Sequence, residues 1–309
     1  MTPRLSVVIP TRNCLPYLPA AIASIRAQTC GPIEIVVVDD GSTDGTDAFL
    51  AQAAAADPLL KPLVHAPAGV SAARNAGIAA ASAPIIAFLD ADDQFLPDVL
   101  LDRLDLLERR ADISLTFADV VSVTPEGRVL GKQFSYWPQF RQWIGGRTGL
   151  LDLGPDAFAM LLAETVCGTS TVIARKSSIE QVGGFDTRYR IGEDWDLWLK
   201  LARVGGVWCD TVCSTRYLAR PGSTSRDTAE LVRSVLQIYK EHVPDPSRIP
   251  QPYRSISKAR LLTSKAMLAR ERDQRLKALI QQGTALLLAP SGNAARDSAF
   301  DLARLLRLK

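Results

Sequence analysis

The feature that most constrains this chain is the alternation of short apolar runs with helical segments over its first hundred residues. The runs are continuous and rich in β-branched residues, as in Leu5–Pro10 and Ile33–Val38. Apolar strands separated by helices favour a parallel sheet with both faces covered. The predicted strands are 5–10, 33–38, 63–65 and 85–89, and the predicted helices are 16–28, 44–56 and 71–81. The sequence therefore predicts a Rossmann-like, mostly parallel α/β sheet flanked by helices, with ligands at the carboxyl ends of the strands.

The rest of the chain is less regular and then becomes helical. The predicted elements are a helix at 96–110, a strand at 113–123, a long loop or flap at 133–155, a strand at 170–174, a helix at 194–204, a strand at 212–218, and helices at 228–242, 253–288 and 293–308. A Pro-Gly-Ser-Thr-Ser segment at 221–225 separates the two patterns. Because 309 residues suffice for one large or two small domains, we expect an α/β domain at 1–225 and a basic helical region at 226–309.

Charge is distributed unevenly along the chain. Residues 1–220 carry 20 Lys+Arg and 25 Asp+Glu, whereas residues 221–309 carry 16 Lys+Arg and 8 Asp+Glu. The basic helices either present solvated faces, pack on a second copy of the chain, or contact an anionic partner such as a membrane surface. No basic motif interleaved with aromatic residues is present, so we expect no nucleic-acid partner.

The cysteine and histidine content restricts the compartment and the metal chemistry. The five cysteines are scattered, and the closest pair, Cys209 and Cys213, has no partner pair. The sequence therefore excludes a disulfide framework and a structural zinc site, and favours a reducing compartment. The N-terminal residues lack a signal-peptide pattern, and no stretch approaches the roughly 20 apolar residues of a membrane span. We expect a cytoplasmic protein, at most peripheral at the inner face of the membrane.

Acidic clusters follow two of the predicted strands. Residues 39–45 (DDGSTDG) follow the second strand, and residues 90–93 (DADD) follow the strand at 85–89. Such strand ends meet at one edge of a parallel sheet, and Asp90 and Asp92 share a face if the chain is extended there. Converging carboxylates suit Mg²⁺ or Mn²⁺, which would in turn bind a diphosphate. The alternative is that these residues only form turns.

Three further places carry candidate functional residues. The segment 69–77 (GVSAARNAG) starts a helix, where Arg74 would hold a phosphate, lock an aspartate or form a surface ion pair. In the segment 192–198 (GEDWDLW), Asp194 is either a helix cap or a carboxylate in a cleft wall, with two tryptophans burying the helix. Arg220 precedes the Gly- and Ser-rich loop.

Taken together, these motifs resemble one known family. The matching segments are Ser6–Asn13, Val38–Asp44, Gly69–Gly77, Phe88–Asp93 and Gly192–Leu199. In this order they are similar to the inverting family-2 glycosyltransferases of the GT-A fold, and the resemblance spans roughly residues 4–225. It implies a nucleotide-sugar donor, most often a UDP-sugar, and a divalent metal, Mg²⁺ or Mn²⁺.

The resemblance also implies residue roles. Pro10 and Thr11 would contact the nucleoside, Asp40 the base, Arg74 the pyrophosphate side, Asp90 the ribose and Asp92 the metal. Asp194 would be the general base, and Ala91 would belong to the nucleotide-sugar site. Arg220 stands where many relatives carry a histidine near the metal, which leaves Arg220 to clamp the diphosphate.

The implied function is transfer of a hexosyl group, with inversion, to a saccharide or lipid-linked acceptor in cell-surface polysaccharide or glycolipid synthesis. The chain lacks the QxxRW motif of processive synthases, which favours transfer of one or a few sugars. A nucleotidyltransferase of related fold is the first alternative, but it would need a glycine-rich basic loop where Thr11–Pro16 stands. A nucleotide-sugar-binding protein without activity is the second alternative, and the retained Asp90, Asp92 and Asp194 argue against it.

Overall fold

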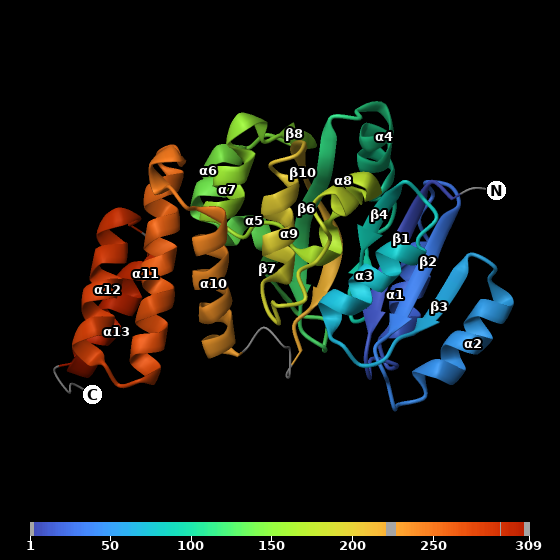
Figure 1. The fold of residues 1–309 in the computed structure, drawn as a ribbon, viewed down its shortest axis with the longest axis horizontal. Coiled ribbons are helices and arrows are strands. Elements are labelled where there is room, and N and C mark those ends of the chain that lie inside the picture. The colour runs from blue at the N-terminus through green and yellow to red at the C-terminus, as the bar shows by residue number, and fades with distance from the viewer. Residues whose placement is uncertain (1–2, 221–226, 291, 306–309) are drawn as a thin grey trace. The chain divides into compact units, whose positions relative to one another are not determined.

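The computed structural model describes residues 3–220, 227–290 and 292–305. The chain divides into two compact units, one formed by Met1–Ala157 with Val166–Pro221 and the other by Phe158–Thr165 with Gly222–Lys309 (Figure 1). The predicted domain boundary at residues 225 and 226 and the whole of the predicted loop at 221–225 lie outside the described residues.

The first unit is built on a mixed sheet. Its strands are β1 (Leu5–Thr11), β2 (Ile33–Asp39), β3 (Leu60–Val64), β4 (Ile85–Phe88), β5 (Gln94–Phe95), β6 (Ile113–Val123), β7 (Val129–Lys132), β8 (Leu150–Asp152), β9 (Ile173–Arg175) and β10 (Gly206–Leu218). In the described residues the order is β3-β2-β1-β4-β9-β6-β10-β5, with β7 on β6 and β8 on β10. The strands β1, β2, β3, β4, β6 and β10 run in one direction, and the other four run against them. This arrangement confirms the predicted α/β sheet.

Helices flank this sheet. They are α1 (Leu18–Arg26), α2 (Thr46–Ala56), α3 (Val70–Ala80), α4 (Leu101–Arg109), α5 (Gln133–Tyr136), α6 (Pro138–Ile144), α8 (Lys176–Gln181) and α9 (Glu193–Leu201). Apolar burial explains the central strands, because every residue of β2 is buried. Close packing explains Gly77 in α3, since a Cβ there would collide with Val8 of β1. The glycine thus lets α3 lie directly against the sheet, beside the strand ends.

Two sequence predictions about local structure are wrong. The segment 133–155 is not one long loop, because it forms α5, α6 and β8. Its aromatic residues drive this folding: Phe134 and Phe140 are buried and pack on Phe117 of β6. The segment 170–174 is not one strand either, since a short 3₁₀ helix at Thr169–Thr171 precedes β9.

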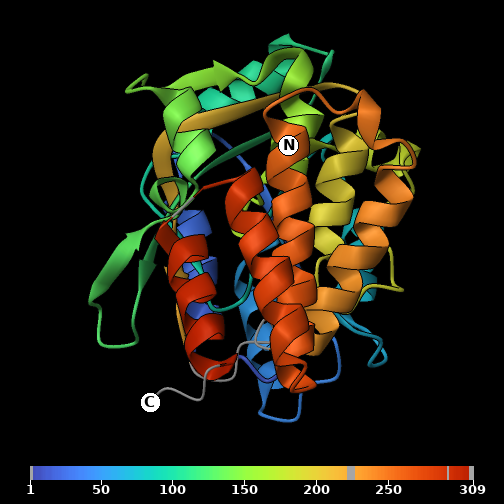
Figure 2. The same ribbon diagram turned by 90° about the vertical axis from the view of Figure 1, so that its left-hand side faces the viewer.

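The second unit is helical, as predicted. It contains α10 (Thr228–His242), α11 (Tyr253–Glu271), α12 (Arg275–Leu288) and α13 (Gly292–Leu305), and most of α7 (Ala157–Ala163) groups with it. The prediction of a single helix at 253–288 is wrong. The helix is interrupted between α11 and α12, where Asp273 adopts a φ of 53°. α12 packs between α11 and α13 (Figure 2).

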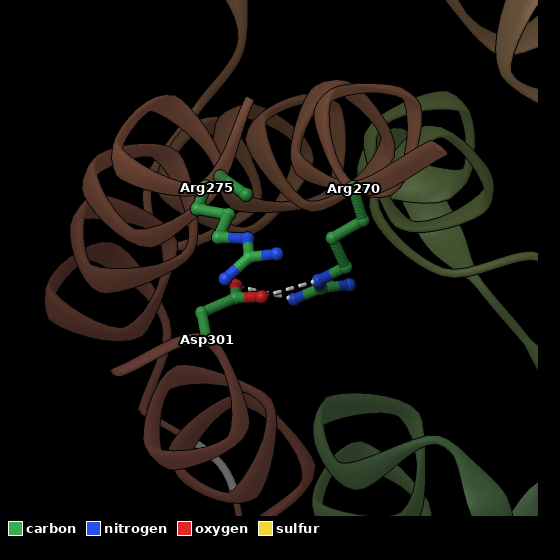
Figure 3. A pocket seen from close by; sticks show the side chains of 4 residues that line it. Arg270, Arg275 and Asp301 are labelled. Atoms are coloured by element: carbon green, nitrogen blue, oxygen red, sulfur yellow. Dashed lines mark hydrogen bonds and ion pairs between the residues drawn. The ribbon is translucent and has the colours of Figure 1, made fainter. Parts of the chain in front are cut away.

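An internal ion pair joins two helices of the second unit. Arg270 of α11 donates to both carboxylate oxygens of Asp301 of α13, at 2.7 and 2.8 Å, and Arg275 points toward the same carboxylate (Figure 3). Asp301 is 2% exposed. Because the charges of Arg270 and Asp301 are paired with each other, we interpret the small pocket that these side chains line as part of the helix packing and not as a ligand site.

None of the described helices has the length and apolar character needed to cross a lipid bilayer.

Candidate functional site

The polar strand ends predicted from the sequence gather at one edge of the sheet. β1 pairs in parallel with β2 on one side and with β4 on the other. Asp40 therefore follows one neighbour of β1, and the segment 90–93 follows the other. Thr11 ends β1 between them, with its hydroxyl buried and without a hydrogen-bond partner in the described part of the chain. An unsatisfied buried hydroxyl at a strand end is a place where a ligand atom fits.

Asp40 shapes the loop that leads into α3. Its carboxylate accepts hydrogen bonds from the backbone N–H groups of Ala68 and Gly69, at 2.8 and 3.0 Å, and its own N–H donates to the carbonyl of Thr11 at 2.9 Å. Gly69 has a φ of 93°, which favours glycine. Asp40 Oδ1 also lies 3.4 Å from Nδ1 of His65, whereas Oδ2 keeps a second lone pair, so the predicted contact with a nucleobase stays chemically open at Oδ2.

Arg74 joins the acidic segment after β4 to the start of α9. Its Nη2 donates to Asp90 Oδ1 and its Nη1 donates to Glu193 Oε1, both at 2.7 Å. The guanidinium also lies over the ring of Phe185, at 5.2 Å. Arg74 is only 3% exposed. Of the uses predicted for Arg74, the structure therefore favours the locking of an aspartate.

The charges in this cluster are not balanced. Burial opposes the charge on Arg74, but Asp90 and Glu193 outweigh it and raise the pKa of the guanidinium. Burial and the neighbouring Asp194 raise the pKa of Glu193 to about 7, against the effect of Arg74. One guanidinium thus faces three carboxylates, which disfavours negative charge on all three at once.

Asp194 projects from the first turn of α9 and is half-buried. Its Oδ2 accepts a hydrogen bond from the hydroxyl of Thr169 at 2.9 Å, and its Oδ1 accepts one from the N–H of Trp195 at 2.7 Å. Trp195 and Trp198 are buried, which fixes the helix in the first unit as predicted. The carboxylate is therefore oriented and still accessible.

Asp92 and Arg220, both predicted site residues, form an ion pair. Arg220 Nε donates to Asp92 Oδ2 at 2.6 Å, and the guanidinium lies over the ring of Tyr17 at 5.4 Å. The side chains of Asp92 and Arg220 are 21% and 29% exposed. Burial lowers and the bond to Asp92 raises the pKa of Arg220, and the net shift is upward. The pair thus presents a fixed, partly exposed cation beside the segment 90–93.

The 3₁₀ helix at Thr169–Thr171 connects these groups, and the sequence prediction missed it. The hydroxyl of Ser170 donates to Asp93 Oδ2 at 2.5 Å and accepts from the N–H of Asp90 at 3.1 Å. Thr169 contacts Asp194, as described above. Asp93 in turn accepts from the N–H of Leu218 at 3.1 Å. One turn of three hydroxyl residues therefore positions the acidic segment after β4, the carboxylate of α9 and the end of β10.

A buried arginine, Arg103, holds this turn through a hydrogen bond to its backbone. Arg103 of α4 is fully buried and donates to the carbonyls of Thr171 and Val99. Burial lowers its pKa to about 10. The only sequence signal for this arrangement is the Gly-Thr-Ser-Thr run at 168–171, whose hydroxyls are common in turns.

The residues at this edge fit a divalent cation held jointly with a substrate. Asp90 and Asp92 each use one oxygen for an arginine, and both side chains are partly exposed. In the described part of the chain, no group of three or more His, Cys, Asp or Glu side chains is placed to bind a metal. Mg²⁺ is commonly bound by one or two carboxylates together with substrate phosphates. The available oxygens of Asp90 and Asp92 match that pattern.

The fold and this edge of the sheet define a glycosyltransferase of the GT-A fold. Residues 6–163, just over half of the chain, match the family model described as Glycosyl transferase family 2. The chain belongs to this family. It is 32% identical over 196 residues to the PGL/p-HBAD biosynthesis glycosyltransferase of Mycobacterium bovis, covering 63% of this chain and 68% of that protein. It is 46% identical over 98 residues to a glycosyltransferase of Nostoc sp., and this match covers 30% of that protein.

Solved structures share the fold at low sequence identity. TarS of S. aureus in complex with UDP-GlcNAc aligns with a TM-score of 0.65 and 16% identity, over 99% of this chain and 92% of that chain. The mannosyltransferase PcManGT of Pyrobaculum calidifontis, in complex with GDP-Man and Mn²⁺, aligns with a TM-score of 0.61 and 20% identity, over 99% of this chain and 81% of that chain. These likenesses confirm the GT-A fold predicted from the sequence.

Proposed function

We propose that this glycosyltransferase moves a hexosyl group from a UDP-sugar to an acceptor hydroxyl with inversion, and that Asp194 is the general base. The observation that carries the proposal is the arginine bridge. Arg74 binds both Asp90 and Glu193, so the donor-side segment and the helix that presents Asp194 belong to one hydrogen-bonded cluster. A base and a leaving group must face the same anomeric carbon for a single displacement.

The proposed reaction is a single displacement in which Asp194 acts as the base. The acceptor hydroxyl is a weak nucleophile at neutral pH, and Asp194 accepts its proton as the oxygen attacks the anomeric carbon. The bond from that carbon to the diphosphate oxygen breaks at the same time, so one displacement inverts the configuration. Thr169 and the Trp195 N–H orient the carboxylate of Asp194. No covalent sugar–enzyme bond is required.

The leaving diphosphate gains negative charge, and Arg220 is the residue that we place beside it. Asp92 fixes the guanidinium, which keeps a part-exposed face. A divalent cation bound by Asp92, with Asp90 beside it, would supply further neutralisation of the diphosphate.

The nucleoside end is assigned to the ends of β1 and β2. Thr11 offers its unsatisfied hydroxyl, Pro10 precedes it, and Asp40 keeps lone pairs for a base N–H. Ala91, which is 3% exposed, follows Asp90 in the same donor-side segment.

The donor and acceptor classes are tested by a substrate screen. We expect UDP release from one or a few UDP-sugars with Mn²⁺ or Mg²⁺ present, faster when saccharide or lipid-linked acceptors are added, and product linkage of inverted configuration by NMR. GDP-sugars are the matched control for recognition of the nucleobase of the donor. Turnover of a GDP-sugar alone would contradict the proposed donor, and retention of configuration would contradict the mechanism.

Thr169 provides a separate prediction about positioning. Thr169→Val keeps the shape but removes the hydrogen bond to Asp194, and a hydrogen bond to a charged group contributes roughly 1.5–3 kcal/mol. We expect kcat to fall about tenfold, with the KM for the donor unchanged. Thr169→Ser retains the hydroxyl and should recover most of the rate. Equal losses in Val and Ser variants would show that Thr169 acts only through packing.

A further inference from the structure

The outer face of α12 is an apolar row that the second unit leaves exposed. Leu276, Ile280 and Leu287 are 59%, 59% and 84% exposed. With Gly283 they are spaced by four, three and four residues, so at 3.6 residues per turn all four lie on one side of the helix. A Cβ built on Gly283 would meet nothing within 4 Å, which shows that open space faces the middle of the row. We call these four positions the α12 row.

The opposite face of α12 already has its partners. Ala278, Gln282 and Ala285 are buried, and the helix packs on α11 and α13. Lys277 and Thr284 of α12 are also exposed, but the α12 row itself consists of apolar side chains and a glycine that nothing in the second unit covers. Exposed apolar rows of this kind mark interaction surfaces.

The helices α11 and α12 carry an excess of positive charge. Residues 253–288 contain eight Lys and Arg but only two acidic residues. Arg272 and Lys277 flank Leu276 in the sequence and are exposed, and Lys258 and Lys265 are exposed on α11. Within the described residues, none of these four cations has an ion-pair partner, and we call them the free cations of the second unit. Their charges are therefore available to an external anion.

An apolar row with basic flanks is the pattern of a helix that lies in the interface of an anionic bilayer. The apolar side chains enter the boundary of the acyl chains, and the cations meet the lipid head groups. A second copy of the chain would cover the row but would bring the free cations close to those of its partner. We infer that the α12 row and the free cations dock the protein on an anionic lipid surface. This inference does not depend on the proposed reaction.

The test is flotation of the full-length protein with vesicles of phosphatidylcholine alone and of phosphatidylcholine with 30% phosphatidylglycerol. We expect binding to the anionic vesicles only, weakened by moderate salt. Lys277→Glu should lower the partition coefficient by at least about fivefold, since one basic residue near such a surface contributes about that factor. Ile280→Asp should abolish binding, and Gly283→Leu should strengthen it by filling the gap in the row.

The matched control is Val64→Asp, at an 85% exposed position in the first unit, which should leave vesicle binding unchanged. Circular dichroism establishes that each variant is folded. Absence of binding to both vesicle types would overturn the inference, and so would equal binding to both. A wild-type dimer that Ile280→Asp converts to a monomer, without any lipid binding, would assign the row to a second copy instead.

Discussion

Asp194→Asn should lower kcat by about 10²–10⁴-fold, the usual contribution of a general base. Asparagine keeps the size of the side chain, and its one carbonyl oxygen can still accept the hydrogen bond from Thr169, so the turn at 169–171 should be preserved although the bond from the Trp195 N–H is lost. It cannot take the proton of the acceptor hydroxyl. We therefore expect the KM for the donor and the affinity for UDP to change little. Steady-state product formation and calorimetric titration of UDP measure the two quantities.

The matched control is Asp102→Asn. Asp102 occupies the same place in the first turn of α4 as Asp194 does in α9, but it is exposed. This variant should keep wild-type kcat. If Asp194→Asn also kept near wild-type kcat, Asp194 would be a helix-terminal residue only, and the proposed base would have to be sought elsewhere.

Asp92→Ala should reduce activity by about 10³-fold or more, because it removes the carboxylate proposed for the cation and releases Arg220. Both effects leave the diphosphate charge without its partners. The second readout is binding: Mn²⁺ should increase the affinity of the wild-type protein for UDP, and this increase should be absent in the variant. The fold should persist, since Asp92 is partly exposed and its ion pair is with the side chain of Arg220.

Asp112→Ala is the control for this substitution. Asp112 also forms an ion pair with an arginine, Arg110, at 2.7 Å, but its side chain is 63% exposed. Loss of this surface pair should have little effect on rate or stability. Full wild-type activity in excess EDTA would contradict the metal. If the wild-type protein were fully active in EDTA but Asp92→Ala were inactive, the charge of the diphosphate would be neutralised by Arg220, held in place by Asp92, without a metal.

The parts of the fold that follow from local pattern could be predicted. The runs at 5–10, 33–38 and 85–89 are apolar except for Ser6 and Glu34, a pattern that favours strands buried on both faces. Each matches its strand to within one residue at either end. By contrast, the segment 133–155 mixes aromatic residues with Gly and Pro and shows no period. Its helices form because Phe134 and Phe140 find Phe117, and that contact is invisible in the local sequence.

In the candidate site, too, some residues could be predicted from the local sequence and others could not. Carboxylates at strand ends are visible as a run such as Asp90 to Asp93, because the strand before them is visible. The partners of those carboxylates are not. Glu193 lies 119 residues from Arg74, and Ser170 lies 77 residues from Asp93. Nothing local distinguishes a serine that positions two aspartates from a serine in any other turn.

The shared guanidinium of Arg74 has a consequence for how such a protein can change over time. Its planar fork serves two carboxylates at once, and a lysine cannot reproduce that geometry. A change at position 74 would leave the buried Glu193 without its cationic partner, and the pKa of Glu193 would rise further. We therefore expect positions 74, 90 and 193 to be inherited together. A hybrid enzyme that takes residues 1–100 from one family member and the rest from another should lose activity whenever these three residues come from lineages with different pairings.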